Sequence, residues 1–236
     1  MKNRERKFLK ALATDIDGTL TDENYLLSIS AIKALRKLDR GGIPVMLASG
    51  NALPVVQTLK RYLGCKGAII CENGAVIKYR KTLKTLGDPR QVRRGLKELK
   101  DKFGNKAEEH WSNRYRLVDI VLKRTLEKSK IEETLSKVEG VKIVDSGFAY
   151  HISSKDVNKG KGLKVASRLM NIDLQNIAAI GDSETDLDLL RSAGFRITLP
   201  NAPIPLREIA HYTTTRSNGK GLTEAAKLLL SKISSF

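Results

Sequence analysis

A short apolar run that ends in closely spaced carboxylates constrains this chain more than any other feature. Residues 10–22 read KALATDIDGTLTD, so Ala11-Leu12-Ala13 leads directly into Asp15 and Asp17. Such a run predicts a buried strand, and residues two apart in a strand face the same side. We therefore expect Asp15 and Asp17 to converge just beyond the strand, where Gly18 permits a sharp turn. Two carboxylates this close repel each other, so the pair indicates a site that holds a divalent cation or shares a proton.

The alternative for this stretch is an ordinary acidic turn or the start of a calcium loop, because D-x-D-G occurs in both. A calcium loop needs further oxygen ligands and a Glu at fixed later positions. The apolar residues Ile16, Leu20 and Leu26 do not fit that requirement.

Helical and strand patterns alternate through the first third of the chain. The expected elements are a helix capped by Ser28 or Ser30, a strand over 43–48, a helix over 54–63, a strand over 68–71 and, after a tight Asn73-Gly74 turn, a return strand over 75–77. This β-α-β-α-β order predicts an α/β fold with a Rossmann-like parallel sheet and helices on both faces. Ligands of such a sheet lie beyond the carboxyl ends of its strands.

The second strand ends at Ser49-Gly50-Asn51, and Pro54 opens the next helix. A hydroxyl and backbone N–H groups at a helix start suit a phosphate group. In isolation the same three residues also read as a turn that caps the helix.

The alternation stops near residue 78. We expect next a basic amphipathic helix over 90–103, a strand over 115–122, a helix over 131–138 and a hairpin formed by 141–144 and 148–152. This α-β-α-β-β order predicts a small inserted α+β domain at 79–156, with a core built from 1–78 and 157–236. Its first strand region contains Trp111, Asn113, Arg114 and Arg116. This group indicates either a site for a substrate carboxylate or simple packing of the Trp beside solvated arginines.

The last third of the chain carries two more groups of polar residues. Asn158-Lys159-Gly160-Lys161-Gly162 precedes a helix that ends at 170, and a Lys at a glycine-rich helix start suggests an anion site. The apolar strand 177–181 runs into Asp182-Ser183-Glu184-Thr185-Asp186, which places Asp182 and Asp186 four residues apart at the start of the next helix. Helix capping alone does not explain two carboxylates there. A strand over 195–199, a short strand at 212–213 and a helix over 222–233 complete the core; the intervening Ser217–Gly221 reads as a connector.

The four segments DIDGTLT, ASGN, NKGKGL and GDSETD, in this order, resemble the four motifs of the haloacid dehalogenase-like phosphohydrolases. One departure is Thr185, where the family often has Asn; both carboxylates of that motif remain. The position of the insert resembles the capped class that acts on small phosphorylated metabolites.

The resemblance implies a Mg²⁺-dependent phosphatase in which Asp15 is the nucleophile that forms an aspartyl phosphate and Asp17 is the general acid and base. It implies Mg²⁺ ligands from Asp15, the backbone carbonyl of Asp17, Asp182 and Asp186, the last either direct or through water. Substrate-binding roles fall to Lys159, with Lys161 as the alternative, and to Ser49, Gly50 and Asn51, which orient the phosphoryl group.

Nearly the whole chain is also similar to the archaeal phosphoglycolate phosphatases, which implies hydrolysis of 2-phosphoglycolate to glycolate and phosphate. A sugar phosphate or mannosyl-3-phosphoglycerate as substrate, a phosphomutase and a basic nucleic-acid-binding protein remain as alternatives.

Composition limits the classes of partner and the cellular location that we expect. The net charge of +17 is spread as +4 in residues 1–10, +8 in 78–158 and +5 elsewhere, and aromatic residues make up only 5%, so we expect no nucleic acid as a partner. The sequence contains no run of 18 apolar residues, so we expect no membrane span. The first ten residues are basic but lack the apolar segment of a secretory signal. We expect a cytoplasmic protein with Cys65 and Cys71 buried and reduced. The sequence leaves the oligomeric state open, a homodimer included.

Overall fold

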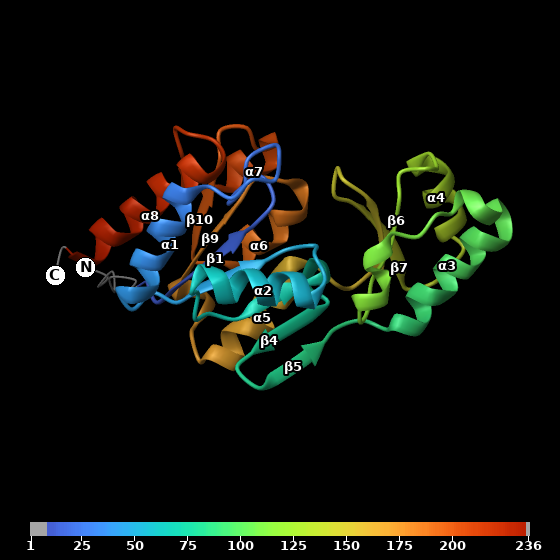
Figure 1. The fold of residues 1–236 in the computed structure, drawn as a ribbon, viewed down its shortest axis with the longest axis horizontal. Helices are drawn as coiled ribbons and strands as arrows, with labels where there is room; N and C mark the ends of the chain where they lie inside the picture. The colour runs from blue at the N-terminus through green and yellow to red at the C-terminus, as the bar shows by residue number, and fades with distance from the viewer. Residues whose placement is uncertain (1–8, 235–236) are drawn as a thin grey trace, which may run out of the picture.

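A computed structural model describes residues 9–234, and the side chains of 9–231. The basic residues 1–8 lie outside that range. Two sheets organise the chain: an eight-stranded sheet in the order β11-β10-β9-β1-β2-β3-β4-β5 and a three-stranded sheet in the order β6-β8-β7. Figure 1 shows the larger sheet at the left and the smaller one, with α3 and α4, at the right.

The bounds of the elements are as follows. The larger sheet comprises β1 (Ala11–Asp15), β2 (Val45–Ala48), β3 (Ile69–Cys71), β4 (Val76–Tyr79), β5 (Thr82–Thr85), β9 (Ile177–Gly181), β10 (Phe195–Thr198) and β11 (Tyr212–Thr213). Its helices are α1 (Ile29–Arg40), α2 (Leu53–Leu63), α5 (Lys159–Met170), α6 (Leu187–Ser192), α7 (Ile204–Ile209) and α8 (Asn218–Ser234). The smaller unit comprises α3 (Pro89–Phe103), β6 (Ile120–Leu122), α4 (Lys128–Leu135), β7 (Val141–Asp145) and β8 (Tyr150–Ser154).

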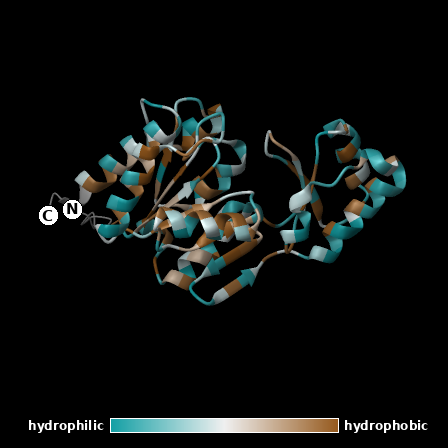
Figure 2. Cartoon of the chain, viewed as in Figure 1, coloured by the Kyte–Doolittle hydropathy of each residue, from teal (hydrophilic) through white to brown (hydrophobic). Residues whose placement is uncertain are grey.

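The larger sheet is parallel from β11 to β3, and β1 lies at its centre between β2 and β9. Successive residues of β1 face opposite sides, so Leu12 packs with α1, α2 and α8 while Ala11 and Ala13 pack with α5, α6 and α7. The hydropathy colouring agrees: the strands are mostly brown, and teal dominates the outer faces of the helices (Figure 2). The predicted α/β, Rossmann-like fold is confirmed, and β1 lies where the chain order reverses, the place at which such sheets bind ligands.

We call residues 89–154 the small lobe. Its hydrophobic core is separate from those of the larger sheet and includes Val92, Leu99, Ile131 and Ile152. The predicted order of its helices and strands matches the order observed. Strand β5, which the predicted insert includes, pairs with β4 in the larger sheet, so the small-lobe elements begin only at Pro89.

Two local predictions differ from the structure. The predicted strand 115–122 is reduced to β6, because the backbone N–H groups of residues 117–119 donate to the carboxylate of Glu72 instead of to a neighbouring strand. The return from β3 to β4 is a 3₁₀ turn at Glu72–Gly74 rather than a two-residue hairpin, and all three of its residues have positive φ. In residues 9–234 no helix combines the length and apolar character needed to cross a membrane.

Candidate active site

The carboxyl ends of β1 and β9 and the start of α5 bring three charged side chains into contact. The Lys159 Nζ donates to Asp15 Oδ1 and to Asp186 Oδ1, both at 2.6 Å. All three residues are buried: Lys159 is 2% exposed, Asp15 4% and Asp186 0%. We call these residues, with Asp182, the strand-end cluster. The structure thus places Lys159 between the carboxylates, whereas Lys161 is exposed and pairs with Asp156.

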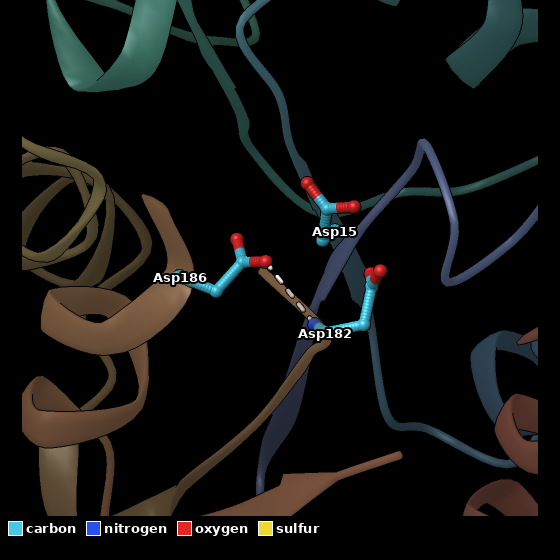
Figure 3. Close-up of side chains that lie close together, drawn as sticks. All are labelled: Asp15, Asp182 and Asp186. Atoms are coloured by element: carbon cyan, nitrogen blue, oxygen red, sulfur yellow. Dashed lines mark hydrogen bonds between the residues drawn. The ribbon is translucent and has the colours of Figure 1, made fainter. Parts of the chain in front are cut away.

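The carboxylates of the strand-end cluster converge on one space. One oxygen from each of Asp15, Asp182 and Asp186 lies within 4.8 Å of the others, and Figure 3 shows the three side chains directed toward one another from two separate segments. Gly18 makes this approach possible, because its φ is +86° and a Cβ there would lie 2.4 Å from Asp182 Oδ2.

Burial and mutual repulsion set the protonation of this cluster. Burial, together with the charge of Asp186, raises the pKa of Asp15 well above its usual value despite the opposing charge of Lys159. Burial likewise raises the pKa of Asp182 to about 6. Burial alone lowers the pKa of the Lys159 ammonium, but Asp15 and Asp186 more than reverse this, and that pKa is raised. One ammonium therefore faces more negative charge than it neutralises, which favours a further cation.

A divalent cation fits this donor set. Magnesium takes oxygen ligands in octahedral geometry at about 2.1 Å, which puts ligand oxygens roughly 3 to 4 Å apart. The three carboxylate oxygens here lie within 4.8 Å of one another, so small side-chain movements bring them to that spacing. Asp15 Oδ2 and both carboxylate oxygens of Asp182 accept no hydrogen bond from Lys159. Asp186 is more fully engaged: its Oδ2 accepts from the backbone N–H groups of Asp182 and Ser183 and from the Ser183 hydroxyl.

Asp17 lies beside the cluster on the same side of the sheet. Its Oδ2 accepts from Asn51 Nδ2 at 2.9 Å and lies 3.5 Å from the Ser49 hydroxyl. The Asp17 side chain is exposed to a hollow, and the protein around that hollow partly desolvates its carboxylate, which raises the pKa of Asp17. Ser49 itself is fully buried and accepts from the backbone N–H of Asn51, so it supports the loop from below.

A cavity of about 500 Å³ lies over these residues and is lined from both lobes. The larger sheet contributes Asp15, Asp17, Gly50, Asn51, Lys159 and Asp182, among others, whereas Ser49 and Asp186 lie behind its wall. The small lobe contributes His110, Trp111, Arg116 and Phe148. Of the four small-lobe residues proposed from the sequence, Trp111 and Arg116 line this cavity.

Comparison with known proteins identifies the family. A family model described as haloacid dehalogenase-like hydrolase matches residues 12–105 and 88–225. The chain belongs to the haloacid dehalogenase-like hydrolases. A phosphoglycolate phosphatase of Methanothermobacter thermautotrophicus is 35% identical over 219 residues, which cover 93% of this chain and 98% of the relative. Another, of Archaeoglobus fulgidus, is 38% identical over 224 residues, covering 93% and 96% respectively.

Solved structures share the fold of this hydrolase. A crystal structure of a Thermoplasma acidophilum protein matches with a TM-score of 0.87 at 23% identity, covering 94% of this chain and 99% of that one. A haloacid dehalogenase-like hydrolase from Bacteroides thetaiotaomicron matches with a TM-score of 0.77 at 21% identity and the same coverage. The resemblance seen in the four sequence motifs is confirmed at the level of the family.

A second group of buried charges joins the lobes and was missed from the sequence. We call Glu72, Arg116, Asp119 and His151 the seam cluster. Glu72 accepts the N–H groups of Leu117, Val118 and Asp119 at 2.9 to 3.0 Å. Asp119 accepts from Arg116 Nη1 and pairs with His151 Nδ1 at 3.0 Å.

The pKa values of the two seam carboxylates move in opposite directions. Burial, reinforced by Asp119, raises the pKa of Glu72 to about 7 against the effect of its three backbone donors. Burial would also raise the pKa of Asp119, but the hydrogen bond from His151 and the charge of Arg116 outweigh it, and the pKa is lowered. No short motif marks these residues; the only sequence hint was the charge of Arg116 near Trp111.

Proposed function

We propose that this hydrolase cleaves phosphomonoesters through an aspartyl phosphate on Asp15, with 2-phosphoglycolate as its substrate. The observation that carries the reaction class is the contact of Lys159 with both Asp15 and Asp186 below a cavity open to small molecules. The substrate is supported by the archaeal relatives that are phosphoglycolate phosphatases and match over nearly their whole length.

In the proposed reaction, the Asp15 carboxylate attacks phosphorus as the bond to the glycolate oxygen breaks. Asp17, whose raised pKa favours the protonated form, gives its proton to that leaving oxygen. A water molecule then attacks the aspartyl phosphate, Asp17 takes a proton from it, and phosphate leaves with Asp15 restored. Asn51 holds the Asp17 carboxylate in place through its 2.9 Å hydrogen bond.

Lys159 supplies a positive charge beside the attacking carboxylate, which reduces its repulsion from the phosphate dianion. We propose that Asp15, Asp182 and the backbone carbonyl of Asp17 hold Mg²⁺, and that Asp186, with both oxygens already engaged, acts through water and through Lys159. When bound there, the ion neutralises charge on the phosphoryl oxygens. Gly50 is proposed to bind those oxygens through its backbone N–H group. Ser49, which accepts the backbone N–H of Asn51, is proposed to orient the phosphoryl group by holding this loop in place.

The small lobe is proposed to act as the cap of this site, within the insert expected at 79–156. It lines the cavity with Trp111, Arg116 and Phe148 while the larger sheet supplies the carboxylates. We also propose a cytoplasmic location, which the two free and buried cysteines favour.

Assays of phosphate release from 2-phosphoglycolate, glucose 6-phosphate and mannosyl-3-phosphoglycerate, with Mg²⁺ or with EDTA, test these proposals. We expect the highest kcat/KM for 2-phosphoglycolate and loss of activity in EDTA. A large preference for a sugar phosphate would overturn the substrate, and substrate conversion without free phosphate would indicate a mutase instead. A steep salt dependence of DNA binding together with no phosphatase activity would support the nucleic-acid alternative.

A further inference from the structure

The cavity contains two separate positive charges among many negative ones. The carboxylates that line it are Asp15, Asp17, Asp22, Glu23 and Asp182. Among the described lining residues, Lys159 and Arg116 are the only lysine and arginine. Lys159 is committed to the phosphoryl end through Asp15 and Asp186. These carboxylates would repel a second anionic group on a substrate, and Arg116 is the remaining lysine or arginine of the described lining that could pair with it.

Arg116 is held rigidly in the wall of the cavity. Its side chain is 5% exposed. Nε donates to the Ser112 hydroxyl at 3.2 Å, and Nη1 donates both to Asp119 and to the carbonyl of Gly50 at 3.0 Å. A guanidinium fixed in this way loses little conformational freedom when it binds a ligand.

The third guanidinium nitrogen is available. Within residues 9–231, Arg116 Nη2 has no hydrogen-bond acceptor, while Nε and Nη1 are both engaged. Because Arg116 contacts Gly50, it also lies next to the loop proposed to bind the phosphoryl group. Because the two places adjoin each other, a substrate held at both carries its second anionic group close to phosphorus.

We infer that Arg116 Nη2 binds the carboxylate of the substrate and so selects phosphomonoesters that carry a second negative charge close to phosphorus. This inference rests on the proposed function, since it assigns one end of the proposed substrate to a residue of the small lobe. Arg116 is a specificity residue, and the chemistry remains with Asp15 and Asp17. A hydrogen bond between two charged groups is the kind of contact that most strongly rejects an analogue lacking one partner.

The experiment compares two substrates of similar size, 2-phosphoglycolate and 2-hydroxyethyl phosphate, in which a hydroxymethyl group replaces the carboxylate. We measure kcat and KM for both with the wild type, Arg116→Gln, Arg116→Lys and the control Arg114→Gln. Arg114 is a suitable control because it is exposed, lies over the Tyr115 ring and does not line the cavity. The Arg114→Gln change removes one positive charge from the small lobe, as Arg116→Gln does.

We expect the wild type to prefer 2-phosphoglycolate, and Arg116→Gln to reduce that preference on the order of tenfold to a hundredfold, mainly through KM. Arg116→Lys retains part of the preference, and Arg114→Gln retains all of it. Because Arg116 also supports Gly50, both substrates lose some rate in Arg116→Gln, and the ratio between them isolates the carboxylate contact.

Three results separate the outcomes. A wild type without preference, or an unchanged ratio in Arg116→Gln, overturns the inference while phosphatase activity stands. Failure of the wild type to release phosphate from any phosphomonoester overturns the proposed function itself. If Arg116→Gln does not fold, as judged by its thermal melt, the wild type and Arg116→Lys decide the question, and equal ratios in these two overturn it.

Discussion

The strand-end cluster and the seam cluster both bury a carboxylate against a cation, yet they treat its charge in opposite ways. Asp15 and Asp119 are 4% and 2% exposed, but the pKa of Asp15 is raised and that of Asp119 is lowered. Burial disfavours the charge at both positions. At Asp119 the donors His151 and Arg116 overcome this, whereas at Asp15 the single cation is shared with Asp186.

The difference separates a reactive arrangement from a structural one. A carboxylate with all its neighbours satisfied is stable as it stands, and Asp119 fits that description. Asp15 and its neighbours carry negative charge that one ammonium does not neutralise, so a further cation stabilises them. Burial alone therefore does not distinguish a catalytic carboxylate from a structural one; the balance of partners does.

The largest effect is expected for Asp15→Asn. Loss of the attacking carboxylate should lower kcat for phosphate release at least about a thousandfold while the melting temperature stays near that of the wild type. Glu184→Gln, an exposed change in the same acidic segment as Asp182, is the matched control and should keep full activity. If Asp15→Asn still released phosphate at the wild-type rate, Asp15 would be a structural carboxylate like Asp119.

The next largest effect, a loss of stability as well as of turnover, is expected for Lys159→Met. The change leaves Asp15 and Asp186 buried without their cation and should lower the free energy of unfolding by about 3–5 kcal/mol at pH 8, as urea denaturation would measure it. The loss should shrink in acid, where the carboxyl groups hold protons. A variant as stable as the wild type at pH 8 would mean that the carboxylates do not depend on Lys159.

Glu72→Gln tests the seam cluster through pH. The folded pKa of Glu72 is about 7, above its usual 4.5, so the folded protein binds the extra proton between these values and wild-type stability falls as pH rises through that window. The neutral Gln lacks this titration. At pH 5 we expect the free energies of unfolding of the two proteins to differ by less than about 1 kcal/mol. Between pH 5 and pH 8 the wild type should lose roughly 1–3 kcal/mol relative to the variant. Parallel stability curves across this range would contradict the prediction.

The smallest effect is expected for Lys161→Gln, which also serves as the control for Lys159→Met. Lys161 is exposed, and its ammonium forms a 3.6 Å ion pair with the exposed Asp156. Such surface pairs contribute little, so stability should change by less than about 0.5 kcal/mol and kcat by less than about twofold. A loss comparable to that of Lys159→Met would reverse the assignment of the two lysines.

Much of the larger sheet was predictable because its pattern is local. Apolar runs such as 177–181 and the carboxylates that follow them predicted both a strand and a polar strand end. The small-lobe strand at 115–122 failed as a prediction because its amides are taken by Glu72, a residue more than forty positions earlier. Alternation along a segment carries no information about a distant acceptor.

The sequence by itself determined the alternation of strands and helices, the positions of the four polar segments and the family to which they belong, because each depends on neighbours along the chain. Only the tertiary structure decided that Lys159 rather than Lys161 contacts the carboxylates, and that Arg116 rather than Arg114 reaches the cavity. These choices depend on which way a side chain points once helices and lobes have packed, and burial with its electrostatic cost is decided at that stage.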